Sequence, residues 1–343
     1  MGCFGGSCPL EMELGWLKEP APYRDVVISQ RVRLARNLLH LPFPHAASEA
    51  QLQAVAQQLR AALEPMGLGA GGVIELARLS LDERAQLTGA RLISPALLPA
   101  LPHRWALISA DGSVIALLNE EDHLRLQITH AGWQPDRLVN ETHRWEQRLN
   151  ALSLRWGYSA RLGYLTASPI NLGSGIRLGL LMHLMGLQRA RQITRWLEAL
   201  QALGCHTRGL YGEGSLAFEG YVQISLLGRH DPLPELLARL RGTLRTLIEA
   251  ELEARIHLDM EGLDAEWEEL TATLRHAHAL SLGTTLRTLA VYRMRAMRRG
   301  DEAQRDFADQ LLFGLAIYPP PEPDYAATQR AQWLRAKIDG APS

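Results

Sequence analysis

Residues 105–125 read WALISADGSVIALLNEEDHLR, and the rest of the chain is organised around this stretch. Its first part holds two apolar runs, 105–109 and 114–118. The dipeptide Asp111-Gly112 between them is one of the strongest short-range signals for a tight hairpin turn. We therefore predict two antiparallel strands joined at this dipeptide.

The second apolar run leads directly into the polar segment 119–125, NEEDHLR. If the strand extends through this segment, the alternation of side chains places Glu121, His123 and Arg125 on one face. A solvated strand face explains isolated polar residues well. It does not easily explain an acid, an imidazole and a guanidinium group aligned at the end of an apolar strand, so we interpret the segment as a candidate functional site.

The composition is that of an ordinary globular protein with a substantial core. Among the 343 residues, 47% are hydrophobic and 21% are charged, and the formal net charge is -1. This balance gives no reason to expect direct binding to nucleic acid or to a membrane. The basic residues are almost all arginines, because Lys18 and Lys337 are the only lysines.

The cysteines and the N-terminus indicate a reducing compartment. Cys3, Cys8 and Cys205 are too few for a disulfide framework, and no Cys or His pair near the first two completes a metal site. No apolar run is long enough to span a membrane, and the N-terminus lacks the layout of a secretory signal. We expect a cytoplasmic protein in which residues 1–22 form a disordered tail.

Two arginines alternate with apolar residues near the start of the folded part. Residues 26–28 predict a short buried strand that continues into 29–37, where Arg31 and Arg33 project to the same side. Two guanidinium forks on one strand face suit a polyanion such as a nucleotide phosphate chain. For this segment taken alone, a solvated strand face is the preferred explanation.

A loop rich in small residues follows a strand predicted at 162–166, and a helix is predicted from about 174 to 187. Such a loop exposes backbone N–H groups at a helix N-terminus, where anions bind. Arg177 in the first turn is unfavourable for the helix dipole, which indicates a compensating anion. The Gly-Lys-Ser/Thr ending of a P-loop is missing.

A second loop, 207–215, surrounds Glu213 with three glycines and resembles a segment that can close over a substrate. A hairpin connection leading to a strand at 221–227 is the alternative interpretation. Another strand is predicted at 73–79, and the predicted helices are 46–63, 80–87, 135–156 and 192–203. Long helices at about 232–256, 264–280, 282–299 and 301–316, with a shorter one near 326–338, predict a helical C-terminal lobe.

Five arginines and two carboxylates now stand at special local positions. These are Arg31, Arg33, Arg125, Arg177 and Arg208, together with Glu121 and Glu213. A transferred phosphoryl group carries negative charge on its oxygens, so its transfer needs a cage of positive groups and strict alignment. A nitrogen nucleophile also needs a carboxylate to orient it and to accept its proton. The set fits phosphoryl transfer from a nucleotide to a guanidinium-bearing acceptor.

Four segments resemble the signature segments of the ATP:guanidino phosphotransferases, the family that includes creatine and arginine kinases. They are 29–37, 119–127, 163–177 and 208–215. The resemblance implies an α+β fold with an antiparallel β-sheet flanked by helices, as in glutamine synthetase. It implies a catalytic domain at 23–230 and an all-helical C-terminal domain at 231–343.

The resemblance also implies roles for individual residues. The catalytic residues it implies are Glu121, Glu213, Arg208 and Ser168. The ATP-binding residues it implies are Ser29, Gln30, Arg31, Val32, Arg33, Arg91, Arg125, Arg177, Leu178, Gly179, Leu180, Leu181, Arg208, Gly209, Leu210, Tyr211, Gly212 and Glu213. It implies ATP and Mg²⁺, with the metal held by nucleotide phosphates and by no protein site.

Within the family, the chain is most similar to the bacterial protein-arginine kinases of the McsB type. The catalytic segment begins near residue 24, which leaves no room for the N-terminal helical domain of small-guanidine kinases. The loop reads RGLYGEGS from 208, and a helical lobe follows the catalytic part. The implied partners are arginine-bearing protein substrates, a Clp ATPase and an activating adaptor, and a homodimer through the helical C-terminal domain is a further expectation.

The sequence departs from this pattern at several positions. Ser168 stands where the family usually has Cys, Gln30 replaces the second Ser of a Ser-Ser-Arg run, and Arg91 replaces a His on the adenosine side. A C-terminal motif that senses phosphoarginine, Arg-Asp-x-x-Arg-Ala, corresponds here to 331–336. Arg335 and Ala336 match the last two residues of the motif, whereas Ala331 and Gln332 replace its first two, so weaker allosteric sensing is expected.

Two alternatives to a protein-arginine kinase remain open. The first is a kinase for a free guanidino compound such as L-arginine, which the missing N-terminal domain disfavours. The second is a weakly catalytic regulator that binds nucleotide or arginine-bearing proteins. Ser168 and the altered C-terminal motif favour the regulator. The seven charged residues at special positions favour an active enzyme.

Overall fold

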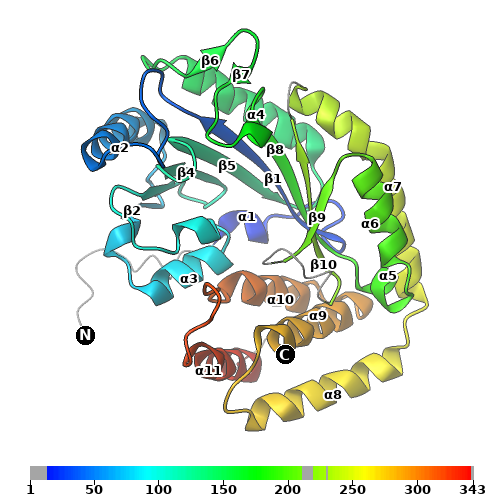
Figure 1. Cartoon of the computed structure of the whole chain (residues 1–343). Helices are drawn as coiled ribbons and strands as arrows, with labels where there is room; N and C mark the ends of the chain where they lie inside the picture. The colour runs from blue at the N-terminus through cyan, green and yellow to red at the C-terminus, as the bar shows by residue number, and fades with distance from the viewer. Residues whose placement is uncertain (1–13, 211–218, 229–230, 341–343) are drawn as a thin grey trace.

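The computed structural model describes residues 14–210, 219–228 and 231–340, and its centre is an eight-stranded antiparallel sheet (Figure 1). The strand order is β2-β3-β4-β5-β1-β8-β10-β9. The strands are β1 (Val27–Arg36), β2 (Gly72–Glu75), β3 (Trp105–Ile108), β4 (Val114–Leu118), β5 (Leu124–Ala131), β8 (Ile176–His183), β9 (His206–Gly209) and β10 (Tyr221–Leu227). The short strands β6 (Tyr158–Ser159) and β7 (Gly163–Tyr164) form a separate two-stranded sheet.

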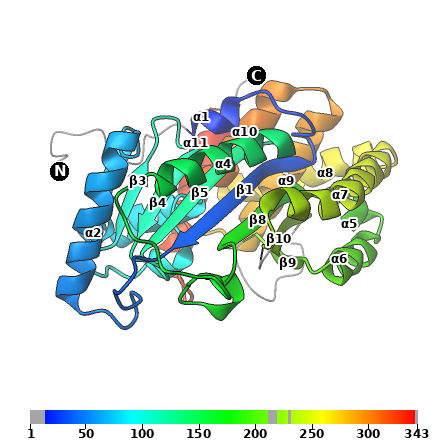
Figure 2. The ribbon, with the colours of Figure 1, turned by 90° about the horizontal axis from the view of Figure 1, so that it is seen from above.

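Four helices cover one face of this sheet, with α2 at one end and α7 at the other (Figure 2). They are α2 (Glu49–Leu63), α4 (Pro135–Asn150), α6 (Ile193–Ala202) and α7 (Leu233–Ile256). Their apolar side chains share a core with alternate residues of the central strands, including Val32, Leu126 and Leu178. The predicted cap of the first helix is confirmed, because Ser48 and Gln51 form a capping box at the start of α2.

The opposite face carries α3 (Leu81–Gly89) on one side and the C-terminal helices on the other (Figure 1). The latter are α8 (Met260–His276), α9 (Leu282–Arg298), α10 (Glu302–Gly314) and α11 (Ala326–Asp339). The antiparallel sheet flanked by helices and followed by a helical region confirms the predicted fold class. In the described residues, no helix has both the length and the apolar character needed to cross a bilayer.

The predicted helix from about 174 to 187 is wrong, because residues 176–183 form the central strand β8. Ile176, Leu178 and Leu180 pack under the covering helices, while Leu181 faces the C-terminal helices. A strand buried on both faces loses the alternation of polar and apolar residues that distinguishes it from a buried helix. A helix, α5 (Met185–Arg189), begins only after this strand. The argument from the helix dipole at Arg177 therefore does not hold.

The prediction of a disordered tail is wrong for residues 14–22. The short helix α1 (Gly15–Lys18) packs Trp16 and Leu17 into the core of the C-terminal helices. Trp16 contacts Phe313 of α10 edge to face, with the ring centroids 5.3 Å apart. Trp16 and Leu17 are large apolar residues of the kind that usually pack into a core. The proline-rich sequence after them resembles a linker, which led to the wrong prediction.

The predicted hairpin at 105–118 is confirmed by β3 and β4, but its second strand does not continue through the polar segment. Residues 119–123 instead form the turn between β4 and β5, and β5 begins at Leu124. Glu121, His123 and Arg125 therefore do not share one strand face. Asn119 adopts a positive φ of 55°, which Asn tolerates better than most residues and which lets the chain reverse here.

Several predicted bounds also differ. The strand expected at 162–166 is only β7, the strand expected at 73–79 is β2 followed by a 3₁₀ turn at Leu76–Arg78, and α4 ends at Asn150 rather than at 156. The division between 23–230 and 231–343 stays a prediction. Helix α7 nonetheless packs on the same sheet face as α2, α4 and α6. Helices α8 to α11 belong to a second apolar cluster, which includes Ile28, Leu181 and Tyr221 of the sheet.

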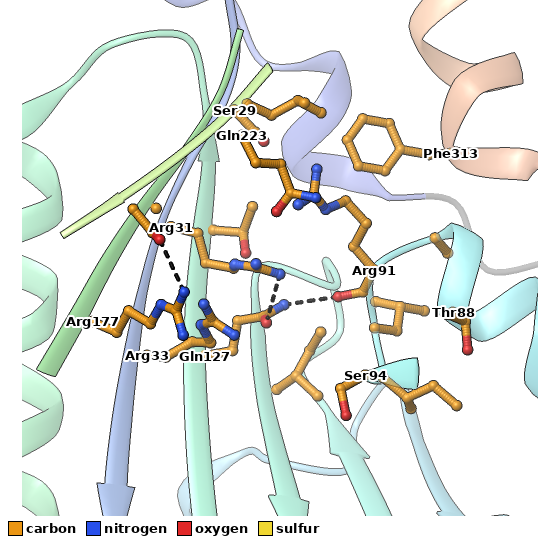
Figure 3. Close-up of a pocket in the computed structure, with 18 of the residues that line it drawn as sticks. Ser29, Arg31, Arg33, Thr88, Arg91, Ser94, Gln127, Arg177, Gln223 and Phe313 are labelled. Carbon is orange, nitrogen blue, oxygen red and sulfur yellow. Dashed lines mark hydrogen bonds between the residues drawn. The ribbon is translucent and has the colours of Figure 1, made fainter. Parts of the chain in front are cut away.

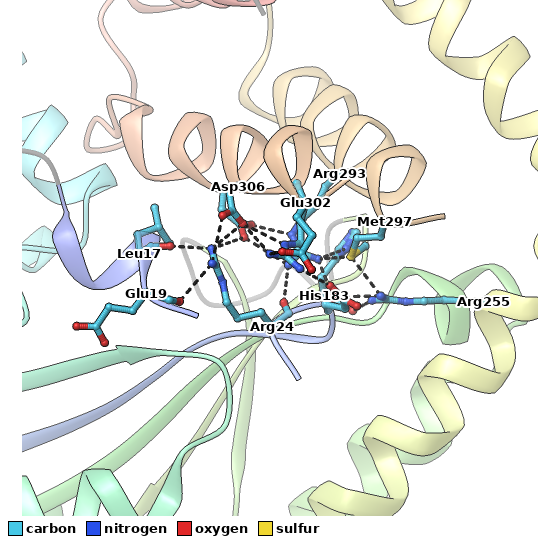
Figure 4. A network of polar contacts seen from close by, with 12 residues as sticks. Leu17, Glu19, Arg24, His183, Arg255, Arg293, Met297, Glu302 and Asp306 are labelled. Carbon is cyan, nitrogen blue, oxygen red and sulfur yellow. Dashed lines mark hydrogen bonds and ion pairs between the residues drawn. The ribbon is translucent and has the colours of Figure 1, made fainter. Parts of the chain in front are cut away.

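A buried ion network joins the C-terminal helices to the sheet (Figure 4). The guanidinium group of Arg293 on α9 donates to Asp309 on α10 at 2.7 Å and to the backbone oxygens of Arg24 and Asp25, which lie just before β1. Arg255 on α7 donates to Glu251 at 2.6 Å and to the same Asp25 oxygen at 3.1 Å. These contacts fix α9 and α10 relative to the first residues of β1.

Candidate active site

A pocket of about 360 Å³ lies on the sheet face between α3 and α10 (Figure 3). This volume is within the range of small-ligand sites. Side chains from the central strands form its floor, and the segment after α3 forms one wall. Its polar lining residues are Ser29, Arg31, Arg33, Thr88, Arg91, Ser94, Arg125, Gln127, Thr129, Arg177, Arg208, Gln223 and Ser225.

The strand register explains why the arginines meet. Arg33 on β1 lies opposite Arg177 on β8, and Arg31 lies opposite Gly179. Because alternate residues of a strand share a face, the side chains of Arg31, Arg33 and Arg177 all project into the pocket. Gly179 has no side chain, so it leaves open space beside Arg31. The prediction that Arg31 and Arg33 project to the same side is confirmed.

Burial and mutual repulsion lower the pKa values of these guanidinium groups. For Arg31 and Arg33 the largest cause is desolvation, followed by the charges of neighbouring arginines. The pKa of Arg177 is lowered by burial and then by Arg208. In the described part of the chain, no carboxylate lies within salt-bridge distance of Arg31, Arg33 or Arg177. A bound anion would relieve this repulsion.

Three polar atoms in the pocket have unused hydrogen-bonding capacity. Nε of Arg33, Nε of Arg177 and Oγ1 of Thr129 are buried without a partner among the described residues. The other contacts of these arginines are neutral: Arg31 donates to Gln127 at 3.1 Å, and Arg177 donates to Ser225 at 2.9 Å. Buried polar groups are normally hydrogen-bonded, so this pattern indicates a ligand that accepts hydrogen bonds.

Arg125 connects the arginine cluster to the acidic turn. Its guanidinium donates to Glu120 at 2.5 Å, and a second nitrogen lies 3.7 Å from the carboxylate of Glu121. Glu120 is buried and also contacts the hydroxyl of Ser94. Glu121 remains 42% exposed, so its carboxylate is available to a substrate. Glu120 thus orients Arg125, whereas Glu121 stays partly accessible to solvent.

The side chain of Ser168 hydrogen-bonds to Glu121. Burial raises the pKa of Glu121, and the neighbouring charge of Asp122 raises it further. A carboxylate with a raised pKa is a better proton acceptor than an ordinary one. The arrangement brings together an acidic group and a hydroxyl at the edge of the arginine-lined pocket.

Asp122 and Asn37 hold this edge in place. Oδ1 of Asp122 accepts hydrogen bonds from the side-chain nitrogen of Asn37 at 2.6 Å and from the backbone N–H of Ala167 at 2.7 Å. Ala167 precedes Ser168, so the acidic turn and the Ser168 loop are directly connected. His123 is fully buried, and its ring bonds Leu38 N and Pro42 O. His123 is therefore a structural residue and has no access to a ligand.

Most of the residues that the sequence indicated come together around the pocket. Those that line it are Ser29, Arg31, Arg33, Arg91, Arg125, Arg177, Gly179, Leu180, Leu181, Arg208, Gly209 and Leu210. The side chains of Val32 and Leu178 lie in the core on the other face, so any ligand contact from them is limited to backbone atoms. Gln30 also faces away and exchanges hydrogen bonds with the backbone of Gln134. Tyr211, Gly212 and Glu213 lie outside the described residues.

Sequence analysis missed several residues of the site. Gln127 and Thr129 follow Arg125 at two-residue steps on β5, so strand alternation could have identified both. Glu120 and Asp122 stood in the acidic segment but received no role. Ser94, Gln223, Ser225, Trp16 and Phe313 carry no local signal that links them to the site.

The C-terminal residues that resembled a phosphoarginine motif have another role in the fold. The guanidinium group of Arg335 on α11 donates to the backbone oxygens of Leu274 at 3.0 Å and Ala277 at 2.6 Å. These are carbonyls at the C-terminal end of α8, where a cation is favourable. Arg335 is thus engaged in capping a helix. Gln332 and Ala336 do not line the pocket.

The chain resembles known proteins over most of its length. Residues 54–254 match the model of the ATP:guanido phosphotransferase C-terminal catalytic domain. A protein-arginine kinase of Symbiobacterium thermophilum is 35% identical over 321 residues, which cover 91% of this chain and 85% of that protein. A protein-arginine kinase of Bacillus subtilis is 34% identical over 250 residues, with coverage of 70% and 67%.

Solved structures share the fold at low sequence identity. A lombricine kinase superposes with a TM-score of 0.57 at 20% identity, covering 74% of this chain and 72% of that one. The duplicated taurocyamine kinase of Schistosoma mansoni, solved with transition-state analogue components, gives 0.57 at 20% identity, covering 78% and 40%. These two likenesses concern the fold alone.

Proposed function

Because the chain belongs to the ATP:guanido phosphotransferase family, we propose that it is a protein-arginine kinase, which transfers the γ-phosphoryl group of ATP to arginine side chains of proteins. The observation that carries the proposal is the cluster of Arg31, Arg33 and Arg177 beside Glu121, in a chain 35% identical to a protein-arginine kinase over most of its length.

The arginines would bind the triphosphate and stabilise the charge of the transferred group. Phosphoryl transfer depends on positioning and on electrostatic stabilisation more than on covalent chemistry with the protein. Groups held by a rigid central sheet need no reorganisation during the reaction, which is what makes such stabilisation effective. Arg208 on β9 lines the pocket and precedes Glu213 by five positions in the sequence, and we propose that it contacts the phosphoryl group being transferred.

Glu121 would orient the acceptor and receive its proton. The carboxylate would bind the substrate guanidinium through paired hydrogen bonds, and Ser168 would lie beside it. As one guanidinium N–H proton passes to the carboxylate, that nitrogen forms a bond to the γ-phosphorus, and the bond from the γ-phosphorus to the oxygen of ADP breaks. Glu213 is proposed as the second carboxylate on the resemblance of the sequence alone.

ATP is the nucleotide substrate, and Mg²⁺ is proposed as its counter-ion. Within the described ranges, no group of three His, Cys, Asp or Glu side chains is arranged to hold a metal. An arginine-lined site is compatible with a metal that reaches it on the phosphate oxygens of the nucleotide. The ion would neutralise part of the phosphate charge, and the steps assigned to the protein residues do not pass through it.

The cellular role follows from resemblance only. We propose that the phosphoarginine product marks proteins for a Clp protease in the cytoplasm, that an adaptor activates the enzyme, and that α8 to α11 form a homodimer contact. Co-sedimentation of a phosphorylated substrate with a Clp ATPase, compared with the same substrate unphosphorylated, tests the first of these. Equal binding of both forms would contradict it.

The function itself is tested by incubating the full chain with Mg²⁺ and γ-labelled ATP, with either an unfolded arginine-rich protein or free L-arginine. We expect label on protein arginine, in an acid-labile P–N bond, and none with the variant Glu121→Gln. Label on free arginine alone would indicate a small-molecule guanidino kinase. ATP binding without transfer to either acceptor would indicate the regulator.

A further inference from the structure

The pocket changes character along its length. At one end Arg33 faces Arg177 and Gln127 across the strands. Four residues earlier on β1, Ser29 faces Leu181 and Ala131, and the row continues through Gln223 on β10 to Arg208 on the edge strand β9. On β1 and its two neighbouring strands this row carries no charged side chain, whereas the row of Arg33 carries two arginines. A ligand that extends along β1 therefore leaves these two arginines and reaches Leu181 and Ala131.

Phe313 of α10 lies at the end of the pocket away from Arg33 and Arg177. It is one of the lining residues of the pocket, and Figure 3 shows it on the side of Ser29, Gln223 and Arg91, away from Arg177. Phe313 is 3% exposed, and its ring packs edge to face against Trp16, which also lines the pocket. An aromatic wall at the far end from the phosphate-binding arginines is suited to a planar base.

The position of this wall is fixed relative to the arginines. Asp309 lies one turn before Phe313 on the same face of α10 and accepts a hydrogen bond from Arg293. Arg293 in turn donates to the backbone just before β1, the strand that carries Arg31 and Arg33 (Figure 4). The ion network therefore sets the distance between the aromatic wall and the phosphate-binding row.

Thr129 is a further polar group that a bound nucleotide can contact. It lies opposite Arg31 on β5, its residue is 6% exposed, and its hydroxyl has no partner among the described residues. A buried hydroxyl in this place can hydrogen-bond a sugar hydroxyl of a nucleoside. A ligand that consisted of phosphate alone would leave the aromatic wall unused.

We propose that Phe313 packs against the base of the bound nucleoside triphosphate, so that the C-terminal helices form part of the nucleotide site. The inference rests on the proposed function, since it assumes that the pocket binds ATP. It adds that a region outside the matched catalytic domain, which ends at residue 254, contributes to recognition of the base. The ligand is a nucleoside triphosphate whose phosphates lie on the arginines.

The test compares two probes by calorimetric titration of the full chain in the presence of Mg²⁺: ATP and inorganic tripolyphosphate, which lacks both base and sugar. Phe313→Ala should weaken ATP binding about three- to tenfold and leave tripolyphosphate binding unchanged. Phe313→Leu keeps most of the packing on Trp16 and should weaken ATP binding about twofold to threefold. The latter variant decides the question if Phe313→Ala fails to fold.

Phe307→Ala is the matched control, because Phe307 lies on the same helix and packs against Tyr292 outside the pocket. It should leave the binding of both probes unchanged. Equal weakening of ATP and tripolyphosphate by the Phe313 variants would show that the residue acts only through the fold, and an unchanged ATP affinity would also overturn the proposal. If the unmodified chain binds ATP no more tightly than tripolyphosphate, the base has no site here and the proposal fails. Failure to bind either probe contradicts the proposed function itself.

Discussion

Arg293 in the ion network and Arg33 in the pocket are both guanidinium groups taken out of bulk water, yet only Arg293 has a carboxylate beside it. Arg293 and its partner Asp309 have side chains that are 0% and 1% exposed and lie 2.7 Å apart. The pKa of Arg33 is lowered first by burial and then by the charges of Arg125 and Arg177. The charge of Arg293 is therefore balanced within the protein, whereas we infer that the charge of Arg33 is balanced by a bound ligand.

The difference separates residues that hold the fold from residues that serve the chemistry. A buried charge that loses its partner destabilises a protein strongly, whereas removal of one charge from a crowd of like charges relieves repulsion. The two groups of arginines should therefore respond in opposite ways to substitution. Stability measurements and activity measurements can distinguish them.

The largest effect is expected in the ion network. Asp309→Ala leaves Arg293 buried without its carboxylate and should lower the free energy of unfolding by about 3–5 kcal/mol. Chemical denaturation followed by circular dichroism measures this change. The control is Asp324→Ala in the connection before α11, for which we expect less than about 0.5 kcal/mol. An equally small effect for Asp309→Ala would remove the distinction between the two groups.

Arg33→Met in the pocket should show the reverse pattern. Phosphoryl transfer should fall by about 10²–10³-fold, because a group that stabilises transition-state charge is lost. The free energy of unfolding should stay unchanged or rise by roughly 1 kcal/mol, since repulsion with Arg125 and Arg177 is relieved. Steady-state kinetics and denaturation of the same preparation test both parts. A large loss of stability would place Arg33 among the structural arginines.

The pH dependence of Glu121 gives an intermediate effect. Burial raises the pKa of Glu121 in the folded protein, and its active form is the deprotonated one. Activity should therefore rise with pH through a pKa above the ordinary glutamate value. The free energy of unfolding should fall over the same window, because the folded state binds the proton more tightly than the unfolded state does.

A pH profile of kcat/KM and denaturation at several pH values measure these two trends. Glu121→Gln should abolish the fall in stability over that window. Arg125 lowers the pKa of Glu121, so Arg125→Met should move the acid limb of the residual activity to higher pH. An acid limb at the ordinary glutamate pKa, or one that Arg125→Met does not move, would contradict this assignment.

The smallest effect is expected at Ser168, which hydrogen-bonds Glu121 but carries no charge. Ser168→Cys introduces a thiol that can ionise beside the substrate guanidinium, so the rate should rise about two- to fivefold. Ser168→Ala is the control that removes the hydroxyl without adding a thiol. A rate below that of the unmodified chain in Ser168→Cys would mean that the site is adapted to serine.

Sequence reasoning predicted the hairpin, the alternation of Arg31 and Arg33 and the C-terminal helices, because each depends on local periodicity or turn chemistry. It failed at β8, where burial on both faces removed the alternation, and at 119–123, where a turn replaced the expected strand. Phe313 could not be predicted as part of the site, since its place there depends on contacts between residues 268 and 269 positions apart in the chain.

Calorimetric titration of ATP into the unmodified chain and into Arg33→Met, at low and high salt, tests most directly whether the pocket arginines bind a nucleotide. We expect that the unmodified chain binds ATP, that salt weakens this binding, and that Arg33→Met binds at least about tenfold more weakly with a smaller dependence on salt. Equal ATP affinities for the two proteins at both salt concentrations would mean that the pocket arginines do not bind the nucleotide.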